Sequence, residues 1–129
     1  MRSVLLVASE LMGAVRLEGM LRAVGCPVTV SDPDVVAVNR AAAACRPAVI
    51  VLDLMLPPEV TAAGFRTADA TGAAVIAFGP HTDTARLSAA RQAGAAEVLP
   101  RSALGTGLVP LVAKHLARAP EDMADTHGA

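Results

Sequence analysis

The sequence predicts an α/β fold in which five parallel strands form a sheet that helices cover on both faces. Short apolar runs alternate five times with longer amphipathic segments along the 129 residues, which is typical of repeated strand–helix units. The apolar runs show little alternation of polar and apolar residues, as expected for strands buried on both faces. The connections are short, so right-handed crossovers and parallel neighbouring strands are expected.

Each predicted strand is an apolar run bounded by turn or capping residues. The first run contains only Val and Leu, and the third is the most hydrophobic segment of the chain. The five predicted strands are Val4–Val7, Pro27–Val30, Ala48–Leu54, Ala73–Phe78 and Glu97–Leu99.

Capping residues delimit the predicted helices. Ser9 is predicted to cap the first helix, with Glu10 in its first turn, and Gly25 is predicted to end it. The remaining predicted helices cover Val35–Cys45, after the helix-start signal Asp32-Pro33-Asp34, then Glu59–Ala70, then a segment that Thr82 or Asp83 caps and that runs through Ala93, and finally an irregular region that opens at Ser102.

Length and composition restrict the function. The chain suits one domain, predicted over residues 1–118, followed by a disordered acidic tail over 119–129. A net charge of -1 and the lack of Trp and Tyr argue against direct nucleic-acid binding. The longest apolar run, residues 48–58, contains Asp53 and is too short to span a membrane, and the first residues lack a signal-peptide cleavage site. We therefore expect a cytoplasmic protein that binds no membrane.

A functional site is expected at the carboxyl ends of the strands. Five strands in a chain of this length suit the flavodoxin-like, doubly wound order 2-1-3-4-5, in which strands one and three flank the switch point. Asp53 lies at the end of strand three and is the central candidate. The other residues predicted around this pocket rim are Ala8, Ser9, Glu10, Gly79, His81 and Arg101.

Two stretches resemble the receiver domain of two-component response regulators. Residues 49–57, VIVLDLMLP, are similar to the family's third strand, its phospho-accepting aspartate and the turn that follows. Residues 94–101, GAAEVLPR, are similar to the approach to its fifth strand. The resemblance covers residues 3–118 and implies a role in signal transduction, with Asp53 as the phospho-acceptor candidate.

The resemblance also implies that the phosphorylation site has lost most of its chemistry. Asp53 is the one member of the family's usual set that stands unchanged. The departures are Ala8 and Ser9 for the two acids that bind Mg²⁺, Gly79 for the Ser or Thr after strand four, Val98 for the aromatic switch residue, Arg101 for the lysine, and Ser102 for the proline that follows it.

These departures remove the charge neutralisation that phosphoryl transfer requires. Mg²⁺ prefers hard oxygen ligands, whereas Ala8 offers none and Ser9 offers a neutral hydroxyl. Two like unit charges about 4 Å apart repel by about 4 kcal/mol at an effective dielectric constant of about 20. Without a metal, a phosphoryl oxygen that approaches Asp53 meets this repulsion as an added barrier, which slows transfer by roughly three powers of ten. We expect lost or weak Mg²⁺ binding and no cofactor. A carboxylate that ends an apolar strand is costly unless paired, which favours contact between Asp53 and Arg101.

The first hypothesis is a non-enzymatic pseudo-receiver that acts through a protein partner, either a histidine kinase or an effector. The 53% hydrophobic content predicts a homodimer or a bound partner, because one small domain can bury only part of its apolar side chains. The apolar surface that stays exposed is then expected to be a partner site. The interaction face is predicted to contain Leu87, Ala90, Val98, Leu108 and Val112, with Arg86 and Arg91 at its margin. Two alternatives stay open, namely a phospho-acceptor that uses Asp53 in an unconventional site and a flavodoxin-like module that binds a small ligand.

Overall fold

A computed structural model describes residues 2–119 and shows five parallel strands in the order β2-β1-β3-β4-β5. The predicted fold class and strand order are therefore confirmed. The tail predicted over residues 119–129 lies, apart from Ala119, outside the described residues. The strands are β1 (Val4–Val7), β2 (Val28–Ser31), β3 (Val49–Asp53), β4 (Ala74–Gly79) and β5 (Glu97–Pro100).

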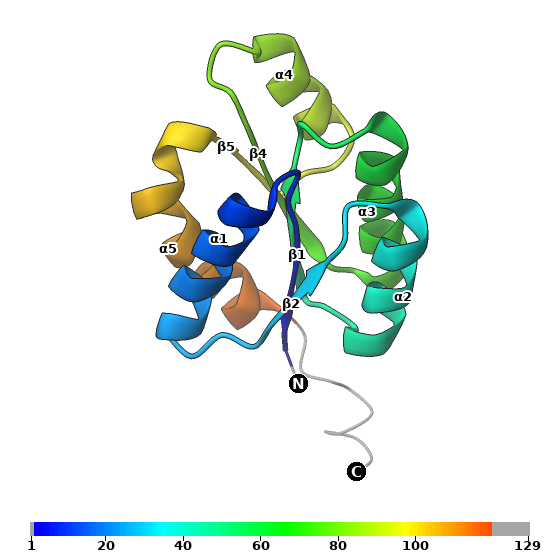
Figure 1. Cartoon of the computed structure of the whole chain (residues 1–129), viewed down its shortest axis with the longest axis vertical. Helices are drawn as coiled ribbons and strands as arrows, with labels where there is room; N and C mark the ends of the chain where they lie inside the picture. The colour runs from blue at the N-terminus through cyan, green and yellow to red at the C-terminus, as the bar shows by residue number, and fades with distance from the viewer. Residues whose placement is uncertain (1, 120–129) are drawn as a thin grey trace.

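Helices cover both faces of this sheet, with α1 and α5 on one side and α2 and α3 on the other (Figure 1). The helices are α1 (Leu11–Ala23), α2 (Val35–Cys45), α3 (Pro58–Thr71), α4 (Thr84–Gln92) and α5 (Leu104–Arg118), with a 3-10 turn, η1 (Arg101–Ala103), before the last. Among the described residues, no helix combines the length and the apolar character needed to span a bilayer.

The sheet separates two apolar clusters. Side chains of Leu5 and Ile50 face α2, α3 and α4, whereas those of Leu6 and Val51 face α1 and α5. Successive residues of a strand point to opposite faces, so a sheet covered on both sides buries every residue of its central strands. This explains why β1 and β3 lack polar alternation.

The prediction that five apolar side chains of α4, β5 and α5 form an exposed interaction face is wrong. Leu87 and Ala90 of α4 are buried against one face of the sheet, with Val98 half-buried in the same cluster, and Leu108 and Val112 of α5 are buried against the other face. The apolar sides of these helices serve the core, which takes up more of the hydrophobic content than expected. The large apolar side chains that remain exposed are Leu11, Met12, Val15, Val24, Val30, Val36 and Met55.

Helix capping follows the sequence prediction at two helices and departs from it at α1. Asp34 and Asp83 cap α2 and α4, each accepting a backbone hydrogen bond within its first turn. The cap of α1 is Glu10, in extended conformation and without a side-chain capping bond, rather than the predicted Ser9. Ser9 contacts another residue, Asp53, which is described below.

A polar contact fastens α5 to the edge strand β5. One carboxylate oxygen of Glu97 lies 2.8 Å from Nε2 of His115 and 3.1 Å from Nζ of Lys114. His115 is thus more than the packing residue that its apolar neighbours in α5 suggest. The hydrogen bonds from His115 and Lys114 hold the pKa of Glu97 below its ordinary value of 4.5.

This lowered pKa makes stability depend on pH. The folded-state pKa of Glu97 lies below the unfolded value, so its contribution is present above pH 4.5 and is lost as pH falls through the folded value. At neutral pH we expect Glu97→Gln to lower the free energy of unfolding by about 1 kcal/mol or less, as for other partly exposed pairs. Urea denaturation of the wild type and Glu97→Gln at neutral and at strongly acidic pH measures the difference in the free energy of unfolding. A difference of the same size at both pH values would contradict the prediction.

Candidate functional site

Asp53 occupies the centre of the candidate site because β3 carries it into the interior. β3 lies between β1 and β4, in a register that sets Leu52 beside Val7 and Asp53 beside Phe78. The Asp53 side chain is only 1% exposed. A carboxylate at this depth loses most of its hydration and must be compensated by the protein.

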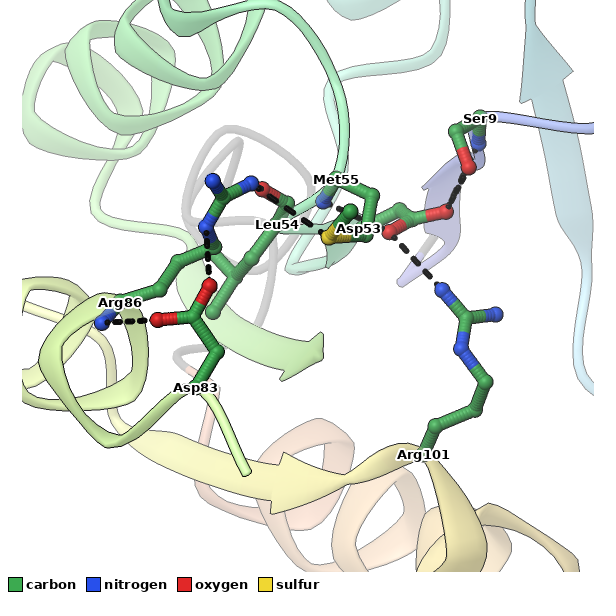
Figure 2. A network of polar contacts seen from close by, with 7 residues as sticks. All are labelled: Ser9, Asp53, Leu54, Met55, Asp83, Arg86 and Arg101. Atoms are coloured by element: carbon green, nitrogen blue, oxygen red, sulfur yellow. Dashed lines mark hydrogen bonds and ion pairs between the residues drawn. The ribbon is translucent and has the colours of Figure 1, made fainter. Parts of the chain in front are cut away.

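Backbone and hydroxyl donors supply most of that compensation (Figure 2). One oxygen of the Asp53 carboxylate, Oδ2, accepts hydrogen bonds from the Ser9 backbone N–H at 2.8 Å and from the Ser9 hydroxyl at 2.5 Å. The other oxygen, Oδ1, accepts a bond from the Met55 N–H at 2.9 Å. The loops that follow β1 and β3 are therefore both fastened to this carboxylate.

Arg101 adds a positive charge from the end of β5. Its Nη2 lies 3.4 Å from Oδ1 of Asp53, and its guanidinium lies 5.2 Å from the centroid of the Phe78 ring. The contact between Asp53 and Arg101 expected from the sequence is present. The Arg101 side chain is 42% exposed, and its bond is longer than those from Ser9 and Met55, so it is the weakest of the four interactions.

The carboxylate of Asp53 is thus fully engaged by the protein itself. Both of its oxygens accept two hydrogen bonds each. Across residues 2–119, no buried side-chain nitrogen or oxygen lacks a hydrogen-bond partner. A phosphoryl group or a metal ion that approached Asp53 would have to displace some of these donors.

The residues around Asp53 do not fit the Mg²⁺ that the receiver resemblance implies. Ala8 is buried and offers no ligand atom. The Glu10 side chain folds over the first turn of α1, with Oε1 3.5 Å from the position a Cβ atom would take at Gly13. Within the part of the chain that the structure describes, no group of three or more His, Cys, Asp or Glu side chains could hold a metal ion.

The other predicted rim residues lie around this centre without touching the carboxylate. A Cβ atom at Gly79 would lie 3.4 Å from Cβ of Leu54 and 3.6 Å from Cδ2 of Leu87, which is ordinary van der Waals contact. His81 is exposed after β4 and lines a groove together with Arg101. Asp53, Ser9 and Arg101 are therefore brought into contact, while Glu10 and His81 remain outside.

Sequence reasoning missed a second cluster of contacts beside the site. Nη1 of Arg86 donates to the Leu54 carbonyl at 2.9 Å and lies 3.4 Å from the Met55 sulfur. Nε of Arg86 is 3.0 Å from an oxygen of Asp83, which also caps α4 (Figure 2). These contacts join α4 to the loop that follows Asp53. The spacing of Asp83 and Arg86 along the chain indicates their ion pair, but the contact of Arg86 with Leu54 arises only from the fold.

We expect Ser9→Ala to destabilise the domain. The substitution removes a hydroxyl that donates to the buried carboxylate of Asp53, a loss of about 1–3 kcal/mol in the free energy of unfolding. Urea denaturation monitored by circular dichroism measures the loss. Ser88→Ala is the matched control, because Ser88 is exposed on α4 and its side chain makes no hydrogen bond within residues 2–119. Equal stability of Ser9→Ala and the wild type would show that the bond contributes nothing net.

No protein-family model matches the chain, and no curated protein matches it. Its fold, however, is that of solved response-regulator receiver domains. The receiver domain of NtrX from Brucella abortus has a TM-score of 0.80 at 16% identity, with 91% of this chain and 100% of that chain covered. A receiver protein from Burkholderia phymatum gives 0.76 at 22%, covering 94% and 100%. A receiver domain from Clostridium thermocellum gives 0.77 at 18%, covering 92% and 96%.

Proposed function

We propose that this chain is a receiver-like signalling domain that is not an enzyme and acts through protein–protein interaction, largely independently of phosphorylation. The receiver fold supports a role in signal transduction. The observation that carries the finer proposal is the saturated carboxylate of Asp53, whose acceptor sites are held by Ser9, Met55 and Arg101.

The saturation of Asp53 opposes phosphorylation in two ways. Oδ2 must give up a hydrogen bond from Ser9 before it can attack phosphorus, because both of its contacts are short. The incoming phosphoryl group brings negative charge, and Arg101 is the only cation that contacts Asp53 among the described residues. A receiver that needs no phosphate would be controlled by its partner, a histidine kinase or an effector.

A phospho-accepting function is the competing candidate, and one observation favours it. Arg101 is partly exposed and its bond to Asp53 is long, so it can move and leave Oδ1 accessible. Such a site would work without the usual metal ligands, since Arg101 would have to neutralise the phosphoryl charge. The two candidates differ in whether Asp53 forms a covalent phosphate.

Incubation with acetyl phosphate and Mg²⁺ distinguishes them. We expect intact-mass spectrometry to find no added phosphate on the wild-type chain, because transfer to Asp53 lacks charge neutralisation. The matched variant carries Ala8→Asp, Ser9→Asp, Gly79→Ser and Arg101→Lys, which restore the residue types of the family, and we expect it to accept phosphate. A stoichiometric phosphate on the wild type that disappears in Asp53→Asn would establish the competing function.

We also propose that the domain self-associates through the start of α1. Leu11 and Met12 are each 76% exposed and follow Ser9 closely, so they lie at the same sheet edge as Asp53. Val15 stands one turn further along α1 and is also exposed. Contiguous exposed apolar side chains of this kind mark partner sites.

Sedimentation velocity at micromolar concentration tests self-association. We expect a dimer in the wild type and in Asp53→Asn, because the contact does not depend on phosphate. Met12→Glu should give a monomer, since a charge would be buried at the contact. Val36→Glu is the matched control, because Val36 is 64% exposed on α2. A monomeric wild type would remove the dimer from the proposed function.

A further inference from the structure

A groove opens beside the Asp53 site, between the start of α5, α1 and the loop that follows β4. Its volume is about 590 Å³, within the range of pockets that bind small molecules. Its lining residues are Arg16, Pro80, His81, Arg101, Ser102 and Gly105. They come from separate elements that the fold brings together at the carboxyl ends of β4 and β5.

The lining of this groove is basic and contains no carboxylate. The side chain of Arg16 makes no ion pair or hydrogen bond with any other described residue, and the same holds for the side chains of His81 and Ser102. Nη2 of Arg16 lies 3.9 Å from the position a Cβ atom would take at Gly105, so the guanidinium reaches across from α1 to the start of α5. Two guanidinium groups, an imidazole and a hydroxyl therefore share one groove.

Arg101 borders both the Asp53 site and the groove. Nη2 contacts Asp53 and the guanidinium stacks over Phe78, while 42% of the side chain remains exposed. A guanidinium carries five N–H donors, and only one of its nitrogens is used by Asp53. Arg101 can therefore donate into the groove without leaving the carboxylate. Neither η1 nor α5 has a side-chain cap or an acid in its first turn, which further favours an anion at this end of α5.

We propose that the groove formed by Arg16, His81 and Arg101 binds a small phosphate-bearing molecule. Arginine forks suit both carboxylate and phosphate. Phosphate suits this groove better, because the lining donors come from several elements and a phosphate group offers more oxygens than the two of a carboxylate. The volume leaves room for more than the phosphate group. The inference does not depend on the state of Asp53, since the ligand would bind non-covalently and outside the carboxylate's own contacts.

Nuclear magnetic resonance titration of the ¹⁵N-labelled full chain tests the inference. The probes are inorganic phosphate and ribose 5-phosphate at constant ionic strength, with ribose as the uncharged control. We expect saturable shifts of the amides of His81, Ser102 and Gly105, with a dissociation constant below about 1 mM for at least one phosphate probe and no shift with ribose. Tighter binding of ribose 5-phosphate would identify a phosphorylated molecule as the ligand, and equal binding would identify free phosphate.

Two substitutions separate a built site from general charge attraction. Arg16→Gln should weaken binding about tenfold, the effect of one charge-assisted hydrogen bond. Arg91→Gln removes the same charge from the exposed surface of α4, outside the groove, and should leave the affinity unchanged. The absence of saturable shifts, or equal weakening by both variants, would overturn the inference. Because these readouts do not involve covalent phosphate on Asp53, they fail or succeed separately from the proposed function.

Discussion

The compensation of one buried carboxylate organises the functional end of this domain. An ionised carboxylate at the end of an apolar strand costs several kcal/mol unless donors replace its lost hydration. For Asp53 the donors come from the loop after β1, the loop after β3 and the residue that follows β5. Three segments far apart in the sequence are thereby held to one side chain. The receiver fold supplies the position, and the local residues determine what can occur there.

Under the proposed function, the donors that stabilise Asp53 also reduce its reactivity. A hydroxyl and an N–H on one oxygen lower the availability of the lone pairs that a nucleophile needs. Adjoining contacts hold the surrounding loops in place, because Arg86 bonds the Leu54 carbonyl to α4 and the Gly79 position is in van der Waals contact with Leu54 and Leu87. Conformational change at this end would therefore require several contacts to break together, which favours a partner or a bound ligand as the input.

The fold could be predicted because it depends on patterns that are visible within short stretches of the sequence. Continuous apolar runs, short connections and capping aspartates predict the strands and helices, and the strand order followed from the doubly wound architecture that five strands in a chain of this length suit. A lone carboxylate after the most apolar run marks the site. The role of Ser9 was not predictable from local sequence, since its hydroxyl could equally cap α1 or bond to Asp53, and only the distance between β1 and β3 decides. The prediction that the apolar faces of α4 and α5 form an interaction surface was wrong for a related reason. Helical spacing identifies an apolar face but does not say whether it meets the sheet or a partner.

Arg101 connects the two features of this end of the molecule. Its hydrogen bond to Asp53 is the longest of the four, so it is the contact that can change with least loss. Ser9 and Met55 would still compensate the carboxylate if Arg101 turned toward an anion in the groove. An arginine at this position has donors that can serve both sides at once, whereas a lysine ammonium would act as a single point charge. Under the proposed function and the proposed groove ligand, Arg101 disfavours phosphorylation of Asp53 and also contacts an anion that is never covalently attached.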